Sequence, residues 1–397
     1  MNGPNHIVSI IDVNRLVSNG GPVADGLRFT TYGKSVSTGE WASGMIFETS
    51  APQLGWAEIP PRGSVRTVPP ALIQVDDALV TGKGPVVMPG GTVLVGSSLV
   101  PDAGKLQNLL KALLEAGLER HDPERIPTAC LLSHPGGDVI YGHWLLDLLP
   151  KAELARDHVP EDVPFLVGKD IPEFAVGLLE RIGIPRERLL RRLPRMSRFI
   201  VAEECLKVQK LYIPTSARNN LFFDPSRCGV YEHLLSQAPL RPKIRAERIF
   251  LSRSALTRNK GLKSDRKLEN AAAVERVFSD MGFTVIQPEK LPFPEQIALF
   301  ANAKVIAGED GSALHNALWC KPESTMVCLS SPRRLNRLHF CVAETRRLHY
   351  RLVRGAIDQS VLDGLEQGTV SNEDAYFAPW AVDPIQLGDA LAGRVFS

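Results

Sequence analysis

Several features that would mark a particular class of protein are absent from this sequence. None of its six cysteines stands in a C-x-x-C pair, which argues against a disulfide framework or a cysteine-rich zinc site. No apolar run approaches the roughly 18 residues of a membrane span, and the N-terminus has no basic region followed by an apolar one. The formal net charge of +2 gives no reason to expect a nucleic-acid or polybasic membrane surface. We therefore expect a cytoplasmic protein with at most peripheral contact at the inner face of the membrane.

The length and composition are those of an ordinary globular protein with room for two domains. The chain has 397 residues, of which 44% are hydrophobic and 23% charged. Residues 1–125 are rich in Gly, Pro and Ser, and this composition predicts irregular β structure with many turns. The strands expected in this segment are Leu72–Val75, Val86–Met88 and Thr92–Val95.

Helical and extended patterns alternate from residue 126 onward, which predicts α/β layers. A helix is expected to open near Tyr141, and a proline-containing, charged linker covers Ser236–Glu247. Gly282 stands where the C-terminal glycine of a helix belongs. Before the linker we expect strands at Ala129–Leu132, Pro164–Val167, Arg198–Val201 and Leu211–Ile213 and a helix at Glu173–Ile182. After it we expect strands at Arg248–Leu251, Phe283–Gln287, Val305–Ala307 and Thr325–Leu329 and helices at Glu269–Met281, Pro294–Asn302 and Ser312–Trp319.

The second run of elements predicts a parallel, doubly wound sheet. The domains expected from the sequence are a β-rich segment at 1–125 that packs on the first lobe, a first α/β lobe at 126–240, a second α/β lobe at 248–370, and a tail with a terminal helix at 371–397.

Ligands of such sheets bind beyond the carboxyl ends of the strands, and three segments of the second half fall there. The first, Ser252–Lys267, concentrates positive charge, and Arg253 at the end of its strand is the best candidate for binding a diphosphate. Arg258 and Lys260 belong to the same segment, although a solvated charged loop explains most of its cations equally well.

The second segment joins a strand to a helix, and its small residues and helix N-terminus suit a phosphate group. Its candidate ligand-binding residues are Gly308, Glu309, Asp310, Gly311, Ser312, Ala313, His315 and Asn316. Either Glu309 or Asp310 could accept hydrogen bonds from ligand hydroxyls, or Asp310 could simply cap the helix. In the third segment, Glu295 could bind a ligand hydroxyl group. Alternatively, its negative charge could simply interact favourably with the positive end of the helix dipole.

A possible catalytic pair lies in the first half of the chain. His143 and Asp147 would share one face of a helix at i and i+4, where a His–carboxylate pair can act as a general base. A satisfied structural pair is the alternative, and the sequence leaves open which of the two residues would be the base. Spacing supports no metal site, since His134, His315 and His339 stand in no ligand pattern.

Two stretches resemble the family-61 glycosyltransferases. YGHWLLDLLPKAEL (141–154) resembles one element of that family, and residues 249–329, with Ser252-Arg253, Asn270 and VIAGEDGSALHNALW, resemble its longer signature. GIPRERLL (183–190) and LKVQKLYIPT (206–215) are also similar, so that the resemblance covers roughly residues 126–330. One departure is that Asp310 stands where the family usually has His in Gly-x-His-Gly-Ala.

The resemblance implies a GT-B-like α/β fold, with two Rossmann-like lobes facing one another and a β-rich irregular N-terminal extension. It also implies an inverting, metal-independent transfer of a sugar from a nucleotide donor, with a UDP-sugar favoured, to a glycan or lipid-linked glycan acceptor in surface polysaccharide or glycoconjugate synthesis. No cofactor beyond this co-substrate and no nucleic-acid partner is expected. A non-catalytic nucleotide-sugar or glycan-binding protein on the same fold is the alternative, and a dehydrogenase is disfavoured because the G-x-G-x-x-G fingerprint is missing.

Overall fold

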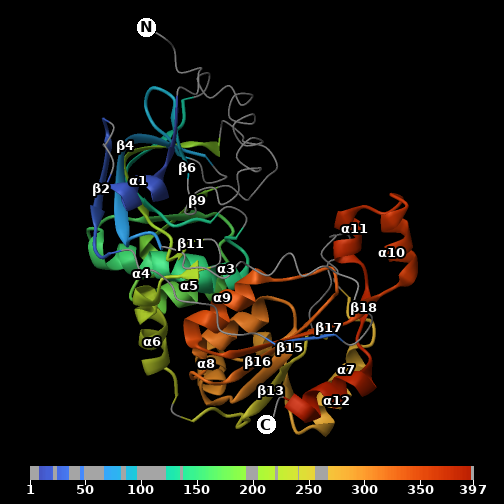
Figure 1. Cartoon of the computed structure of the whole chain (residues 1–397). Coiled ribbons are helices and arrows are strands. Elements are labelled where there is room, and N and C mark those ends of the chain that lie inside the picture. The colour runs from blue at the N-terminus through green and yellow to red at the C-terminus, as the bar shows by residue number, and fades with distance from the viewer. Residues whose placement is uncertain are drawn as a thin grey trace. The chain divides into compact units, whose positions relative to one another are not determined.

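The chain folds as two compact units in a computed structural model (Figure 1). Unit 1 comprises residues 1–39 and 64–234, and unit 2 comprises residues 40–63 and 235–397. The structure describes residues 9–20, 25–34, 45–48, 67–81, 86–95, 122–134, 137–193, 204–219, 222–239, 241–254 and 267–394. None of the helices in these ranges is both long enough and apolar enough to cross a membrane.

Unit 1 is built on a mixed sheet with the strand order β1-β6-β5-β4-β10-β7-β8-β9, and β2 also pairs with β4. The strands are β1 (Ser9–Asp12), β2 (Leu27–Thr31), β4 (Ala71–Val80), β5 (Val86–Val87), β6 (Thr92–Val95), β7 (Glu124–Leu131), β8 (Phe165–Gly168), β9 (Leu189–Leu193) and β10 (Leu206–Pro214). β7 pairs in parallel with β8 and β10, whereas β4 is antiparallel to β10. The N-terminal strands therefore continue the sheet of the α/β part of the unit.

Helices of unit 1 follow the sequence expectation in its central part. The helix expected near Tyr141 begins there and consists of three consecutive segments, α3 (Tyr141–His143), η3 (Trp144–Leu148) and α4 (Leu149–His158). The second expected helix is α5 (Glu173–Arg181). Helix α1 (Val13–Asn19) lies in the segment predicted to be β-rich, and the strand expected at Arg198–Val201 falls outside the described residues. The remaining elements are η4 (Arg186–Arg188), β11 (Arg218–Asn219), β12 (Phe222–Phe223), η6 (Pro225–Arg227) and α6 (Gly229–Ser236).

The turn η3 is a π-helix, and the proline that follows it explains why. Pro150 has no N–H with which to continue the α-helical ladder, and its ring crowds the carbonyl group four residues earlier. The turn before it widens, and the N–H of Leu149 bonds to the carbonyl of Trp144, five residues back. Asp147 lies inside this widened turn, with its side chain buried.

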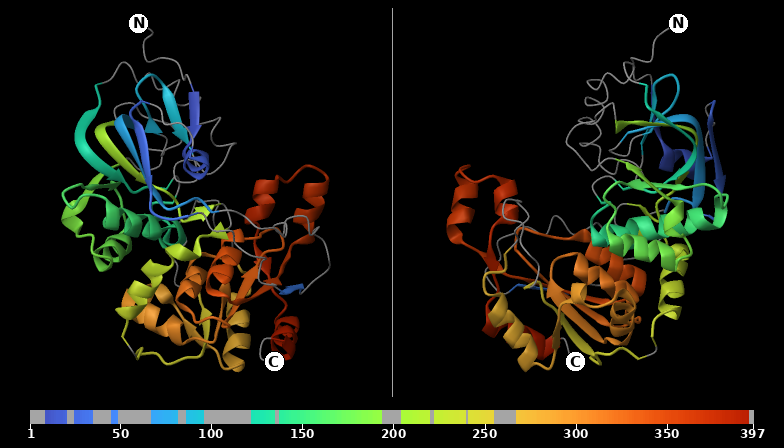
Figure 2. Two further views of the ribbon diagram at one scale, coloured as in Figure 1. Left: turned by 60° about the vertical axis from the view of Figure 1, so that its left-hand side comes forward. Right: turned by 180° about the vertical axis from the view of Figure 1, so that it is seen from behind.

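Unit 2 contains the parallel sheet that the sequence predicts. Its six strands run in the order β14-β13-β15-β16-β17-β3, and every neighbouring pair is parallel. They are β3 (Met45–Glu48), β13 (Arg248–Leu251), β14 (Thr284–Ile286), β15 (Val305–Glu309), β16 (Thr325–Ser330) and β17 (His349–Arg354). β3 comes from the N-terminal quarter of the chain, and Figure 2 shows it as a short blue strand beside the orange ones. Strands of residues 1–125 thus belong to both units.

Helices lie on the two faces of this sheet. Alternate residues such as Phe250, Ala307 and Val327 share one hydrophobic core with Phe278 and Leu387. These last two residues come from α7 and α12, which therefore cover that face. The helices of unit 2 are α7 (Ala271–Asp280), η7 (Pro288–Lys290), α8 (Phe293–Asn302), η8 (Ser312–Trp319), α9 (Arg337–Arg346), α10 (Gln359–Glu366), α11 (Asn372–Phe377) and α12 (Pro384–Arg394), and the short strands β18 (Ala356–Ile357) and β19 (Trp380–Ala381) pair beside them.

The C-terminal end of α7 confirms the role expected for Gly282. Its φ of +80° is in the left-handed region, which glycine adopts without a steric cost. The Gly282 N–H bonds to the Ser279 carbonyl at 2.9 Å, and the Phe283 N–H bonds to the Phe278 carbonyl at 3.0 Å. This pair of bonds is a Schellman motif, which ends the helix and starts β14.

The strand order fixes where a ligand of unit 2 would be expected. From β13 the chain moves to β14 on one side and then returns to β15 on the other. The connections on the two sides of β13 lie on opposite faces, so the carboxyl ends of β13 and β15 form the switch point at which ligands of such sheets usually bind. These ends carry Ser252-Arg253 and Glu309-Asp310, two of the segments that the sequence singled out.

Candidate functional site

The two strand ends of unit 2 are joined through Arg253. Its Nη1 donates a hydrogen bond to the backbone carbonyl of Asp310 at 3.2 Å, and its side chain is half-buried. Ser252, one residue earlier, bonds through Oγ to Glu275 at 2.5 Å and is fixed on α7. The side chain of Arg253 therefore contacts the turn before η8, and the strands that carry the two are neighbours in the sheet.

Glycines at 308 and 311 permit this close approach. A Cβ atom at Gly308 would lie 3.0 Å from Cβ and 3.2 Å from the carbonyl oxygen of Leu251 on the neighbouring strand. A Cβ atom at Gly311 would collide with Nη1 of Arg253. The backbone at Gly311 is extended (φ 170°), so space and not backbone conformation favours glycine there.

Asp310 is buried and paired inside the protein. Its Oδ2 lies 2.7 Å from Nη2 of Arg334, and its Oδ1 accepts a hydrogen bond from Nδ2 of Asn336 at 2.9 Å. Both partners come from the loop between β16 and α9, where Asn336 also caps α9. His339 of α9 lies 3.2 Å through Nε2 from the carbonyl oxygen of Gly311. Asp310 thus anchors the turn, and Glu309, which is half-buried, is the acid of this segment with exposed surface.

The other candidate residues of this segment differ in how far their side chains are exposed to solvent. Ser312 and Ala313 are partly exposed at the start of η8, where backbone N–H groups have no acceptor within the helix. His315 and Asn316 are buried. Asn316 bonds to the Ala313 carbonyl at 3.1 Å and accepts from Trp319 at 3.1 Å, and the His315 ring packs edge-on against His339. These two residues therefore support the turn from within.

Three candidates lie away from this arrangement or outside the described residues. Glu295, in the first turn of α8, accepts a hydrogen bond from the backbone N–H of Lys243 at 3.0 Å and so ties α8 to the segment that enters unit 2. Arg258 and Lys260 are in residues 255–266, which the structure does not describe.

The loop that supports the turn was not among the candidates predicted from the sequence. Arg334, Asn336 and His339 follow the carboxyl end of β16, the strand next to β15. Their position after a predicted strand end was the available signal, because the carboxyl ends of parallel strands meet at one edge of the sheet.

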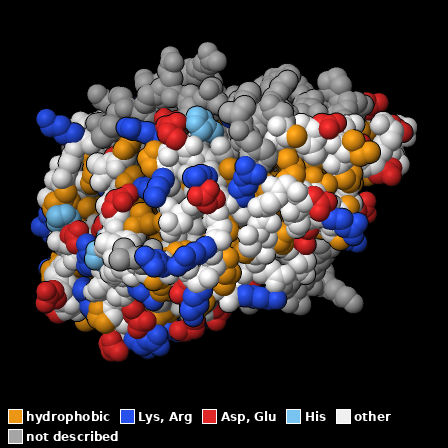
Figure 3. Space-filling model, turned by 90° about the horizontal axis from the view of Figure 1, so that it is seen from below, with side chains coloured by type: hydrophobic (Ala, Val, Ile, Leu, Met, Phe, Trp, Pro, Cys, Tyr) orange, Lys and Arg blue, Asp and Glu red, His pale blue; other side chains and the backbone are white. Residues whose placement is uncertain are grey.

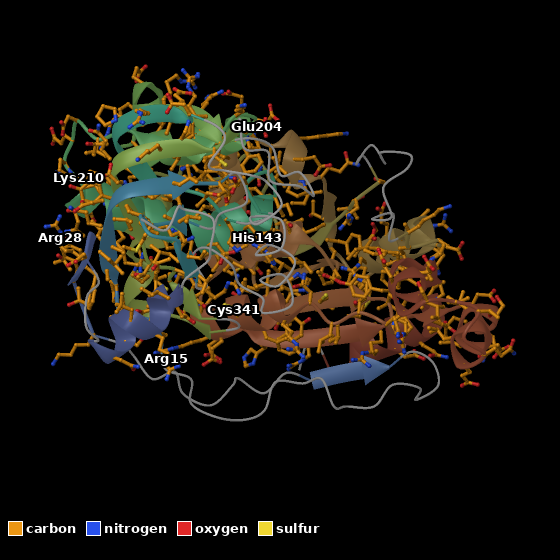
Figure 4. The ribbon with its side chains drawn as sticks, turned by 90° about the horizontal axis from the view of Figure 1, so that it is seen from above. Arg15, Arg28, His143, Glu204, Lys210 and Cys341 are labelled. Atoms are coloured by element: carbon orange, nitrogen blue, oxygen red, sulfur yellow. The ribbon has the colours of Figure 1, made fainter. Side chains whose placement is uncertain are left out.

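In unit 1 the pair expected from spacing is present. His143 Nδ1 lies 2.7 Å from Asp147 Oδ2, which confirms that the two residues share one helix face. The Asp147 side chain is 1% exposed and that of His143 is 23% exposed, and Figure 4 labels His143. Because a carboxylate can only accept a hydrogen bond, the neutral His143 ring carries its proton on Nδ1 and has an unprotonated Nε2.

Each oxygen of Asp147 has its own partner. Oδ2 bonds to His143, whereas Oδ1 receives Nε of Arg218 at 2.9 Å and Nη2 of Arg218 at 2.8 Å. Arg218 comes from the short hairpin of β11 and β12, far from Asp147 in the sequence. Nothing in the local pattern around residue 147 pointed to this arginine.

The environment of Asp147 keeps its carboxyl group ionised. Burial alone would raise its pKa, but Arg218, His134 and His143 outweigh burial and lower the pKa well below its ordinary value. An acid of such low pKa, with both oxygens engaged and no exposed surface, is a poor acceptor of a proton from an external hydroxyl group. The exposed member of the pair is His143.

A second imidazole stacks on His143. The rings of His134 and His143 lie 4.4 Å apart and nearly parallel, and Nε2 of His134 is 3.6 Å from Asp147 Oδ2. Burial, opposed by Asp147, lowers the pKa of His134 to about 3, so this ring is neutral at physiological pH. A Cβ atom at Gly137 would lie 2.6 Å from His134 Nδ1 and 2.8 Å from His143 Cβ, so the stack requires glycine there.

Further charges surround this cluster. Lys151 of α4 is buried and donates to the Ser133 carbonyl at 3.2 Å, and burial lowers its pKa to about 8. Asp138 accepts from the backbone N–H of His134 at 2.7 Å, and burial raises its pKa.

Two groups of potential metal ligands exist within the described ranges. His134, His143 and Asp147 form one, and Asp310, Cys328 and His339 form the other, each with ligand atoms within 4.8 Å of one another. In both groups an arginine already forms an ion pair with the carboxylate, Arg218 in the first and Arg334 in the second. A metal cation would have to displace that guanidinium group or bind beside it. In each group the charge of the carboxylate is already balanced by the arginine.

Comparison with known proteins adds one match. The model of the family described as Glycosyltransferase 61 matches residues 141–327, which include the His143–Asp147 pair and the Arg253–Gly311 turn. No curated protein matches the sequence.

Proposed function

Because residues 141–327 carry a glycosyltransferase family 61 domain, the protein is a glycosyltransferase, and we propose that its donor is a nucleotide sugar bound by unit 2. The observation that carries this proposal is the contact of Arg253 with the turn before η8, at the switch point of a doubly wound parallel sheet. Crevices at such switch points are the usual ligand sites of these sheets.

The chemistry of this turn suits a diphosphate. Arg253 supplies a guanidinium group, which forms charge-assisted hydrogen bonds to phosphate oxygens. The backbone N–H groups at Ser312 and Ala313 add donors that point out of the helix start. Glu309, which keeps exposed surface, would accept hydrogen bonds from a ribose or sugar hydroxyl group. These donors would stabilise the negative charge that develops on the leaving nucleotide, and a UDP-sugar is the donor that we favour.

In unit 1 we assign the general base to His143. Asp147 fixes the tautomer and the orientation of the imidazole, so that Nε2 can take the proton of an acceptor hydroxyl group. The deprotonated oxygen attacks the anomeric carbon on the face opposite the nucleotide, and the nucleotide leaves with its electron pair. The product linkage is then inverted relative to the donor. The acceptor that we propose is a glycan or lipid-linked glycan of surface polysaccharide or glycoconjugate synthesis.

The test combines donor binding with turnover. UDP, GDP, CMP and dTDP sugars are compared by thermal shift, and we expect one nucleotide class to raise Tm, since a ligand at about 100 times its Kd adds roughly 2.7 kcal/mol to the stability of the folded state. The same donor should be consumed with glycan acceptors, and NMR of the product should show inverted configuration. A Tm shift without any transfer would favour the non-catalytic alternative, and no shift with any sugar nucleotide would contradict the donor site.

A glycine substitution tests the contact at the turn. We expect Gly311→Ala to displace Arg253, because the added Cβ atom would collide with its guanidinium group, and to raise the donor KM about 10-fold, since misplaced binding groups cost about this much or more. Gly177→Ala is the matched control, because a Cβ atom at this helical glycine of α5 meets no atom within 4 Å. Steady-state kinetics with the donor varied gives the answer, and an unchanged KM for Gly311→Ala would mean that the Arg253 contact is dispensable.

A further inference from the structure

We propose that Arg218 is a positioning residue for the base: it occupies one oxygen of Asp147 and thereby assigns the other oxygen to His143. This inference rests on the proposed function, in which His143 takes the acceptor proton. It adds a third member, from a separate hairpin, to the pair that the helix provides.

The geometry of Asp147 carries the first step. A carboxylate held only by His143 could rotate and present either oxygen to the imidazole. Arg218 donates to Oδ1 from two nitrogens, at 2.9 and 2.8 Å, and so holds this one oxygen in place. Oδ2 is then left 2.7 Å from Nδ1 of His143. The orientation of the imidazole therefore depends on Arg218 through the carboxylate of Asp147.

The hairpin that carries Arg218 is itself anchored. The Arg218 N–H donates to Ser216 Oγ at 3.3 Å, and Arg218 pairs with Phe223 across β11 and β12. Phe223 is buried and packs against Tyr231, whose hydroxyl group donates to the carbonyl of Leu145 in η3 at 2.8 Å. Besides its direct contact with Asp147, Arg218 is thus linked to the π-turn through Phe223 and Tyr231. These contacts hold the arginine and the turn in fixed relative positions.

Charge carries the second step. The charged and titratable groups that face Asp147 are Arg218, His134, His143 and Lys151. Arg218 balances the charge of Asp147 within this buried site. Without Arg218 an unpaired carboxylate would remain buried beside His143, and a buried charge that has lost its partner is strongly destabilising. The carboxylate would then turn toward other donors, so Arg218 keeps it in the orientation that positions His143.

Two substitutions separate these two contributions. In Arg218→Gln both the charge and the paired donors are lost, and we expect kcat to fall about 10- to 100-fold while the acceptor KM stays unchanged, since a misplaced catalytic group lowers turnover without weakening ground-state binding. Arg218→Lys keeps the charge but loses the second donor nitrogen. We expect it to recover part of the activity, with kcat about 10-fold below the wild-type value.

Arg186→Gln is the matched control: it removes an arginine of the same unit that pairs with Glu180 at the surface, and it should change neither kcat nor the acceptor KM. Wild-type kcat in Arg218→Gln would overturn the inference. A rise in acceptor KM as large as the fall in kcat would also overturn it, because a loss of local structure impairs binding and turnover together. If Arg218→Gln does not fold, wild-type kcat in Arg218→Lys overturns it. Absence of transfer by the wild-type protein would instead contradict the proposed function.

Discussion

Replacing Asp147 by Asn is expected to lower kcat by about 10³-fold or more while the Kd for the donor stays unchanged. The carboxamide has one acceptor oxygen in place of two, so it cannot serve both Arg218 and His143. An amide nitrogen turned toward His143 would impose the wrong tautomer, with the proton on Nε2, and this is the atom that must accept the proton of the acceptor. Turnover at saturating substrates gives kcat, and calorimetric titration with the donor gives Kd.

Two comparisons make this result specific. Asp170→Asn changes an exposed aspartate of the same unit and should behave as the wild-type protein. His143→Ala should match Asp147→Asn in kcat, because the two residues act as one unit. Near-normal turnover of Asp147→Asn would show that the base lies elsewhere.

Replacing Arg253 by Ala is expected to raise the donor KM by about 10- to 100-fold, the range that corresponds to a lost hydrogen bond to a charged group. A decrease in kcat should accompany it, because the charge on the leaving nucleotide grows in the transition state and the guanidinium group binds it more strongly there. Kinetics with the donor varied, beside calorimetric titration with the free nucleoside diphosphate, measures both effects.

The matched control for this prediction is Arg276→Ala. Arg276 is exposed on α7 of the same unit, and its removal changes the net charge by the same amount. Arg253→Lys should recover part of the affinity, because lysine keeps the charge without the planar fork. Unchanged donor binding in Arg253→Ala would remove the diphosphate from this turn.

Basic and acidic side chains are interspersed on the face shown in Figure 3. The described part of this face therefore presents no broad field of one sign that would steer an anion from a distance.

Local signals in the sequence determined much of unit 2. Apolar periodicity and the glycine at 282 give the strand and helix order from β13 to β16, because these features act within a few residues. The short connections then require parallel neighbours, which places Arg253 and the Gly308–Ser312 turn at one edge. In the same way, the i, i+4 spacing was sufficient to pair His143 with Asp147.

Tertiary structure decided what these residues can do. β3 joins the sheet of unit 2 from residues 45–48, and no local pattern identifies the partner of an edge strand. Asp310 was a candidate for binding a ligand, but inside the protein Arg334 balances its charge and Asn336 donates a hydrogen bond to it. Arg218 reaches Asp147 across 71 residues and, together with His143, engages both oxygens of the buried carboxylate. Periodicity and spacing depend only on residues that are close in the sequence. Burial and charge pairing, in contrast, arise only when segments distant in the sequence pack together and exclude water.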